Sequence, residues 1–127
     1  MFKVRFADCE AGEGTLQLMI NMHIVVFITA ANNKEAKRIA HRLIKDKLAA
    51  CANIADEIES FFWWKGKVVQ AKEALLIIKS KKEKLAKIIK LVYSLHSYEV
   101  PEIIALPIID GYKPYLEWID ESISKLT

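Results

Sequence analysis

Residues 58–80 read IESFFWWKGKVVQAKEALLIIKS and decide the fold. Two runs rich in β-branched and aromatic residues flank the short sequence Lys-Gly-Lys at 65–67, a pattern typical of a β-hairpin. Gly66 is free to adopt the positive φ that a tight hairpin turn needs. Because both runs are longer than the other strand candidates in the chain, we expect the hairpin to project beyond the rest of its sheet.

The segment before the hairpin predicts a strand followed by a helix. Residues 23–29 (HIVVFIT) form an uninterrupted β-branched and aromatic run, which suits a strand buried on both faces. Asn32 lies three residues before Glu35, a spacing that resembles a capping box at the start of a helix. Apolar residues recur at helical spacing within residues 34–48, so one face of this helix is expected to pack on a sheet.

The segment after the hairpin predicts a helix, a strand and a further helix. Ser80 begins a Ser-x-x-Glu capping box, and the helix that follows is expected to end near His96. Residues 102–110 predict a fourth strand, which lies at an edge of the sheet or carries a bulge at Pro107, because that proline has no N–H to donate to a neighbouring strand. Pro114 is placed to open the last helix.

The resulting order is β-α-β-β-α-β with an additional C-terminal helix. We therefore predict an α+β, ferredoxin-like sandwich in which helices cover one face of a four-stranded antiparallel sheet. The length of 127 residues is that of one domain. The pattern of a packed domain begins at Met22, so residues 22–127 are predicted to be that domain and residues 1–21 a leader or extension of unassigned role.

The far end of the hairpin predicts a closed homo-oligomer. It carries Phe61, Phe62, Trp63 and Trp64, and an aromatic ribbon exposed to water promotes aggregation. Pairing with further copies of the chain removes this hazard. The hydrophobic fraction of 53%, which is rich for so small a chain, agrees with an additional buried surface. We predict that these four aromatic side chains lie in a subunit interface.

Composition excludes several classes of protein. The net charge of +3 is too small to predict nucleic-acid binding, and the lysines of residues 79–90 are best interpreted as a solvated helix face. Residues 22–31 are apolar but too few to span a bilayer, and the first 22 residues lack the apolar core of a secretory signal. Two cysteines, Cys9 and Cys51, make no disulfide framework. We expect a cytoplasmic protein with neither a nucleic-acid nor a membrane partner.

Motifs of catalysis and metal binding are weak. Cys51 and His96 are the one pair after residue 21 that resembles a nucleophile and a base, but no nucleophile elbow or phosphate-binding loop accompanies them. The small apolar neighbours of Cys51 favour a buried structural cysteine. The three histidines, His23, His41 and His96, form no HxxxH pair. The sequence therefore predicts a protein that is not an enzyme and that works by assembly and binding.

Two phrases place polar side chains at the ends of predicted elements, where binding sites usually lie. The first is FWWKGK at residues 62–67, followed by Glu73 on the returning strand. The second is HSYEVPEI at residues 96–103, which gathers an imidazole, a phenol and two carboxylates around a proline turn. A polar network that merely caps the end of the helix is an equally good interpretation of the second phrase.

These phrases resemble those of the CutA family, the divalent-cation tolerance proteins. The resemblance covers nearly the whole chain from Met22 onward and is specific in combination, although each phrase is weak alone. The matching phrases, in family order, are AACAN at 49–53, WKGK at 64–67 with Glu73, IKS at 78–80, HSY at 96–98 with PEI at 101–103, and YLEW at 115–118.

The resemblance implies a homotrimer similar to the PII signalling proteins, in which long hairpin strands pair between subunits. It also implies a link to tolerance of copper and other divalent ions. Copper-binding members carry a cysteine late in the first strand and a His-His pair before the tyrosine; here Ile28 and Leu95 stand at two of those positions, and only His96 remains. A metal at His96 would need a further ligand, for which the candidates are Cys51, Glu99, Glu102 and a neighbouring subunit.

Three functional hypotheses follow, in order of preference. The first is a trimeric binding or regulatory protein whose cleft between subunits holds a metal ion, copper among the candidates, or a small anionic ligand. The second is a structural trimer, or a PII-like sensor of a small ligand without metal. The third is a hydrolase that uses Cys51 and His96. The residues predicted to line the cleft are Trp64, Glu73, Lys79, His96, Tyr98 and Glu102.

Overall fold

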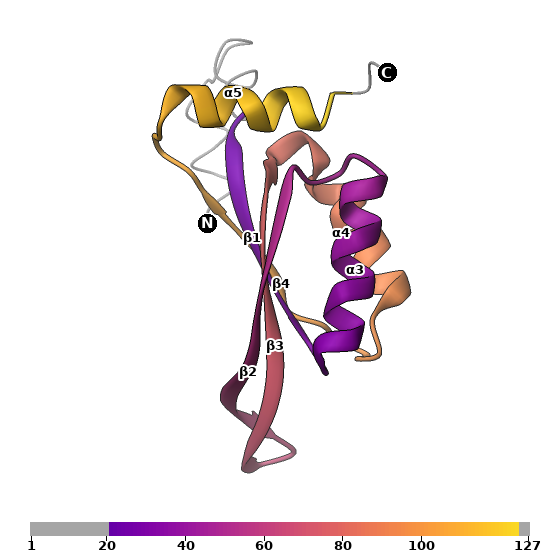
Figure 1. Ribbon diagram of the computed structural model, residues 1–127. Helices are drawn as coiled ribbons and strands as arrows, with labels where there is room; N and C mark the ends of the chain where they lie inside the picture. Colours follow the sequence, from indigo (N-terminus) through magenta and orange to yellow (C-terminus); the bar gives the residue numbers. More distant parts are fainter. Residues whose placement is uncertain (1–20, 125–127) are drawn as a thin grey trace, which may run out of the picture.

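The computed structural model describes residues 21–124, which form a four-stranded sheet with helices packed against it (Figure 1). The predicted alternation of strands and helices is confirmed. The residues 1–20 of the predicted leader, Cys9 included, lie outside the described residues. The elements are β1 (His23–Ala30), α3 (Asn33–Lys45), β2 (Cys51–Trp64), β3 (Lys67–Lys81), the 3-10 helix η1 (Lys82–Lys84), α4 (Leu85–Leu95), β4 (Ile103–Pro107) and α5 (Lys113–Ser122).

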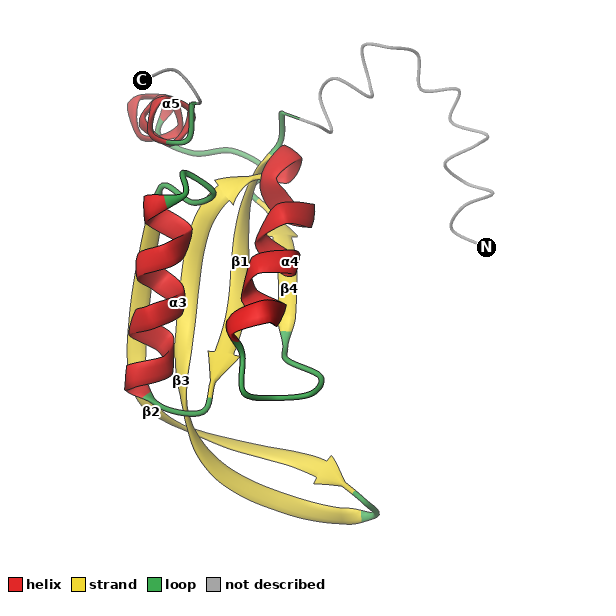
Figure 2. Cartoon of the chain, turned by 90° about the vertical axis from the view of Figure 1, so that its right-hand side faces the viewer, coloured by secondary structure: helices red, strands yellow, loops and turns green. Residues whose placement is uncertain are grey.

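The strands follow the order β2-β3-β1-β4, and every neighbouring pair is antiparallel. β4 therefore lies at an edge, which is one of the two alternatives that Pro107 predicts. Helices α3 and α4 lie side by side on one face of the sheet (Figure 2). The core between these two layers is made by Ile24, Val26 and Ile28 of β1, Leu76 and Ile78 of β3, Ile39 and Leu43 of α3, and Ile88 and Val92 of α4.

The two hairpin strands are the longest in the sheet. β2 has 14 residues and β3 has 15, against 8 for β1 and 5 for β4. Lys65 and Gly66 have φ values of 51° and 78°, and positive φ at both central positions is what a type I′ hairpin turn requires. A bulge between Ala55 and Ile58 disturbs the register, and bulges bend the strand that carries them. The hairpin accordingly curves away from the sheet at its far end (Figure 2).

The predicted capping box at Ser80 is wrong. β3 continues to Lys81, which precedes η1 without capping it through a side-chain hydrogen bond. The side chain of Ser80 lies on the buried face of β3, where its hydroxyl donates a 2.6 Å hydrogen bond to the carbonyl of Leu48. By contrast, Asn32 caps α3 as predicted, since its side-chain oxygen accepts from the Glu35 N–H at 2.9 Å.

Two strand boundaries also differ from the sequence prediction. β2 begins at Cys51, where it pairs with Lys79, because the small residues before Ile58 continue the ladder despite their low β-propensity. β4 ends at Pro107 rather than at residue 110: its register with β1 ends at the pair Ile24–Pro107, and one further backbone bond joins the Ile108 N–H to the His23 carbonyl. The sequence also predicts that the first strand is buried on both faces, but β1 is fully buried on only one face in the single chain.

The hydroxyl of Ser80 provides a test of this packing. Ser80→Ala removes the donor to the buried Leu48 carbonyl, so we expect the free energy of unfolding to fall by about 1–3 kcal/mol. Urea unfolding at a fixed protein concentration measures the change. Ser94→Ala is the matched control, because Ser94 makes the same kind of bond, to Leu91, at an exposed position. Equal effects of the two variants would contradict the prediction.

Candidate functional site

The candidate site is built around the loop that follows α4. His96 ends that helix, and its side chain is completely buried. Its Nε2–H donates to the carbonyl of Thr29 at 2.6 Å, and its Nδ1 accepts from the Tyr98 N–H at 3.0 Å. Both ring nitrogens are thus engaged, and the imidazole is the neutral tautomer protonated at Nε2. His96 ties the loop to β1 and has no lone pair left for a metal in this arrangement.

Glu35 in the first turn of α3 holds the same loop from the other side. Its Oε1 accepts from the Ala31 N–H at 2.8 Å and its Oε2 from the Ser97 N–H at 2.7 Å. The side chain is buried, and burial alone would raise its pKa. The hydrogen bonds from Ala31 and Ser97 outweigh burial, so the pKa of Glu35 is lowered below its ordinary value. The sequence indicated Glu35 only as part of a helix cap and missed this function.

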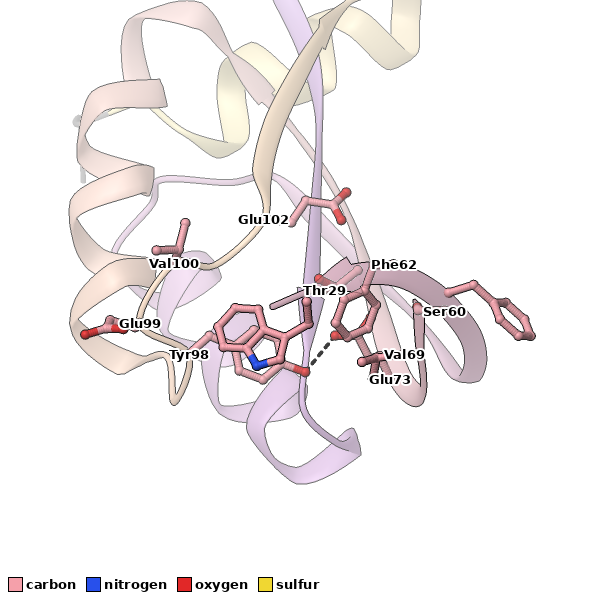
Figure 3. A pocket seen from close by; sticks show the side chains of 11 residues that line it. Thr29, Ser60, Phe62, Val69, Glu73, Tyr98, Glu99, Val100 and Glu102 are labelled. Carbon is pink, nitrogen blue, oxygen red and sulfur yellow. Dashed lines mark hydrogen bonds between the residues drawn. The ribbon is translucent and has the colours of Figure 1, made fainter. Parts of the chain in front are cut away.

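Tyr98 and Glu73 meet across the site. The Tyr98 hydroxyl donates to Glu73 Oε2 at 2.6 Å (Figure 3). The centroid of the Tyr98 ring lies 4.7 Å from that of the His96 ring. Burial raises the pKa of Tyr98, and the hydrogen bond to Glu73 and the negative charges of Glu73 and Glu35 raise it further. The phenol therefore stays protonated and donates throughout the physiological pH range.

A cavity of about 880 Å³ opens beside this pair, between the hairpin and the loop after α4 (Figure 3). Four of the six predicted cleft residues line it: Trp64, Glu73, Tyr98 and Glu102. His96 does not line the cavity; its ring contacts Tyr98, which does. The remaining lining residues are Thr29, Ser60, Phe61, Phe62, Val69, Glu99 and Val100.

Lys79, the remaining predicted cleft residue, is not part of this cavity. It lies six positions from Glu73 along β3, or about 20 Å at about 3.3 Å per residue. There its ammonium group contacts the side-chain oxygen of Asn53. The single chain therefore leaves the cavity without the positive charge that the sequence assigned to it.

Cys51 also lies away from His96. It pairs with Lys79, whereas Thr29, the partner of His96, pairs with Leu75; the four positions between them on β3 span about 13 Å. The Cys51–His96 dyad of the hydrolase hypothesis is thus not assembled within one chain.

Cys51 is half-buried rather than buried, which corrects the expectation of a buried cysteine. Its thiol donates to the Asn53 side-chain oxygen at 3.7 Å. It also faces Tyr115 of α5. Burial raises the pKa of Tyr115, and the neighbouring Cys51 raises it further.

Metal ligands do not converge in the single chain. Within residues 21–124, no three side chains of His, Cys, Asp or Glu lie close enough together to hold a metal ion. A metal site that used His96 or Cys51 would have to draw ligands from more than one chain and displace the bonds that His96 makes here.

Because the pKa of Glu35 is lowered, the destabilisation caused by removing its charge should depend on pH. At pH 7, Glu35→Gln should destabilise the protein by about 1–3 kcal/mol, because an amide has one acceptor oxygen for two backbone N–H groups. The wild-type carboxylate stabilises the fold above its unfolded pKa of about 4.3 and loses this effect as the pH falls through its lower folded pKa. The difference between the two proteins should therefore shrink below about pH 4.

Urea unfolding at pH 7 and again in acid measures this difference. Glu117→Gln, at an exposed position of α5, is the control that should change little at either pH. A destabilisation by Glu35→Gln that is independent of pH would show that the charge of Glu35 is not what holds the loop.

The Tyr98 hydroxyl gives a second prediction. Tyr98→Phe keeps the ring against His96 but leaves Glu73 without its donor, so we expect a loss of about 1–3 kcal/mol in unfolding free energy. Because burial and Glu73 raise its folded pKa, wild-type Tyr98 stabilises the protein fully below about pH 10 and less above it. The phenylalanine variant should lack this alkaline loss. Thermal unfolding from pH 7 to pH 11 measures both effects.

The sequence and fold of this chain match those of known proteins. The family model described as CutA1 divalent ion tolerance protein matches residues 24–122. The divalent-cation tolerance protein CutA of Archaeoglobus fulgidus is 49% identical over 102 residues, which are 80% of this chain and 99% of that protein. The chloroplastic Protein CutA 1 of Oryza sativa is 48% identical over 99 residues, 78% of this chain and 56% of that longer protein.

Solved structures agree with these relatives. The structure of the periplasmic divalent cation tolerance protein CutA from Archaeoglobus fulgidus superimposes with a TM-score of 0.79 at 48% identity, and the match covers 81% of this chain and 100% of that one. CutA1 from Oryza sativa superimposes with a TM-score of 0.80 at 44% identity, covering 85% of this chain and 99% of that one. Sequence and fold together show that this chain belongs to the CutA1 family of divalent ion tolerance proteins.

Proposed function

We propose that this protein is a homotrimer that binds a ligand in the response to divalent metal ions and catalyses no reaction. The observation that carries the proposal is the cavity beside the Tyr98–Glu73 pair, one wall of which is the projecting aromatic hairpin. A preformed cavity next to a surface that needs covering is what a binding protein assembled from several copies requires. The family name supplies the link to metal tolerance.

The second face of the sheet, on which α5 packs at the end near Cys51 and His23, supports the assembly. Helices α3 and α4 cover one face of the sheet (Figure 2). The side chains that alternate along the strands with the buried ones belong to the other face. That face is largely apolar and only partly buried in the single chain. Its apolar members are Val25, Phe27, Leu75, Ile77, Ile104 and Leu106.

The hairpin adds a second unpartnered surface. Phe61 and Trp63 are 65% and 73% exposed, and Phe62 and Trp64 are also exposed. Further copies of the chain that pack on the open sheet face and pair with the hairpin would cover both surfaces at once. A trimer of ferredoxin-like protomers, similar to the PII proteins, is the arrangement that the resemblance to the CutA family implies.

The ligand is proposed to occupy the cavity at the edge of this assembly. Glu73 and Tyr98 form its base, while Glu99 and Glu102 are exposed at its rim. Lys79 and Cys51 would join the cavity only from a neighbouring subunit, and a copper or other divalent ion would likewise need ligands from more than one chain. His96 is proposed to position Tyr98 rather than to bind metal.

A second candidate function is a scaffold in which the same residues only stabilise the trimer. The bonds of His96 and Glu35, which hold the loop rather than a ligand, favour this alternative. This alternative predicts a trimer that binds neither copper nor a small molecule.

The location of the protein is proposed from composition alone to be the cytoplasm. No helix within residues 21–124 has the length and apolar character needed to cross a membrane. The names of the relatives include a chloroplastic and a periplasmic protein, so cell fractionation is the direct check.

Native mass spectrometry with titrated Cu(II) tests the proposal, because it reports the number of subunits and of bound ions together. We expect three chains per particle and a defined number of copper ions, which falls in Glu73→Gln/Glu102→Gln but not in the control Glu117→Gln/Glu121→Gln, which carries the same change in net charge. A protein that remains a single folded chain would overturn the assembly. A trimer that binds no copper would exclude the metal-binding function, and the scaffold and the small-molecule sensor would remain.

A further inference from the structure

We propose that the outer side of helices α3 and α4 binds a linear polyphosphate, which is a flexible chain of anionic phosphate groups. The surface concerned is distinct from the cavity beside Tyr98, and the inference does not depend on what that cavity binds. It is called the basic face below and consists of the exposed lysines of α3, η1 and α4, which are Lys34, Lys37, Lys45, Lys82, Lys87 and Lys90.

Positive charge is concentrated in the helical layer. α3, η1 and α4 together contain nine lysine or arginine residues and two acidic ones, although the net charge of the whole chain is only +3. The rest of the chain therefore carries a net negative charge. Because α3 and α4 lie side by side on one face of the sheet, their charges add on a single surface (Figure 2). The sequence indicated only the lysines of residues 79–90 as a solvated helix face and missed those that α3 brings beside them.

The acidic residues of this layer do not neutralise the basic face. Glu35 is buried and accepts from two backbone N–H groups, while Glu83 lies 3.7 Å from Lys81 of β3. Within residues 21–124, no carboxylate lies within ion-pair distance of any lysine of the basic face. Ammonium groups held near one another without counter-charges repel, and a bound polyanion relieves this repulsion while it releases its own condensed cations.

The basic face is long enough for several phosphate contacts at once. Lys34 and Lys45 are eleven residues apart on α3, which corresponds to about 16 Å at about 1.5 Å per residue. Arg38 connects this row to the neighbouring helix, because its guanidinium group donates to the Leu95 carbonyl at the end of α4 at 3.5 Å. A ligand with closely spaced charges along a chain can therefore contact lysines of both helices, whereas a single phosphate contacts one or two.

The residue types favour phosphate groups alone over nucleic acid. Lysine is a flexible point charge that contacts phosphate without the fixed geometry of arginine. The two arginines of α3 are already engaged, Arg42 with Asp46 and Arg38 with the Leu95 carbonyl. Tyr93 is the one aromatic residue of α3 and α4, so the surface offers little stacking for the bases of a single strand.

The apolar residues of the same helices argue against a lipid bilayer as the partner. Helices that bind a membrane surface insert an apolar face between the lipids. The apolar faces of α3 and α4 are already buried against the sheet, where Ile39, Leu43, Ile88 and Val92 belong to the core. The large apolar side chains that these helices expose are Ile44, Ile89 and Tyr93, and three such side chains provide little area to insert.

The proposed assembly leaves the basic face accessible. The surfaces assigned to neighbouring chains are the hairpin and the face of the sheet opposite to α3 and α4 (Figure 2). A trimer would carry three copies of the basic face. A polyphosphate long enough to contact two copies should bind more tightly than a short one, because the second contact is made within the same complex.

Isothermal titration calorimetry of the full-length protein with medium-chain sodium polyphosphate tests the inference. The buffer is freed of metal ions, so that none can bridge phosphate to a carboxylate. We expect binding that weakens steeply as the salt concentration rises, and no binding of orthophosphate at the same concentration of phosphate groups. A protein that does not bind polyphosphate at low salt would overturn the inference.

Two further probes check the choice of ligand. Single-stranded oligothymidine DNA carries phosphates together with bases, and vesicles that contain phosphatidylserine carry anionic headgroups on a bilayer. At an equal concentration of negative charge, both should bind at least tenfold more weakly than polyphosphate. Binding of the DNA or of the vesicles as tight as that of polyphosphate would overturn the choice of polyphosphate as the partner.

Two double variants locate the bound chain. Lys37→Gln/Lys90→Gln removes one lysine from each helix and keeps helix propensity, so it should weaken polyphosphate binding at least fivefold and make its salt dependence shallower. Lys67→Gln/Lys113→Gln removes the same charge from exposed positions of the hairpin and α5 and should change neither. Equal effects of the two double variants would show that only net charge matters and would overturn the assignment to the basic face.

The outcome is separable from that of the proposed function. Native mass spectrometry of the same samples reports the subunit number of the wild type and of each variant independently of polyphosphate binding. A trimer that does not bind polyphosphate overturns this inference alone, and a single chain that does bind it overturns the homotrimer alone.

Discussion

The buried carboxylate of Glu35 is the interaction on which the candidate site depends. It accepts hydrogen bonds from Ala31, at the end of β1, and from Ser97, in the loop after α4, while its own helix begins between them. One side chain thus joins the junction between β1 and α3 to a loop that lies 62 residues further along the chain. A buried carboxylate is stable only when such donors replace water, which is why the hydrogen bonds and the lowered pKa occur together.

His96 completes this arrangement from the opposite side. Its two nitrogens satisfy the Thr29 carbonyl and the Tyr98 N–H, so the loop is held between α3 and β1 before any ligand is present. Tyr98 is then positioned to donate to Glu73 on β3. His96, the one residue of the family's metal-ligand set that this chain keeps, therefore positions Tyr98, and the aromatic and acidic side chains in front of it line the cavity.

The hairpin connects the fold to the assembly. Its strands are nearly twice as long as β1, and the bulge after Ala55 bends the strand that carries it. The same ribbon supplies one wall of the cavity and the exposed aromatic residues of the proposed interface. A ligand in that cavity, as proposed, would therefore contact the same hairpin that neighbouring chains are proposed to cover.

The sequence by itself determined the element order, the projecting hairpin and the cap at Asn32, because each depends on short-range periodicity or on a single turn residue, whereas Pro107 left an edge or a bulge open for β4. It also brought Glu73, Tyr98 and Glu102 into one hypothesis, through phrases that resemble a family. Only the tertiary structure decided that Lys79 and Cys51 lie elsewhere, that Ser80 bonds Leu48 rather than capping a helix, and that Glu35 joins the start of α3 to the loop after α4. These depend on the register between strands and on which face of the sheet a side chain occupies, and both are fixed by long-range pairing.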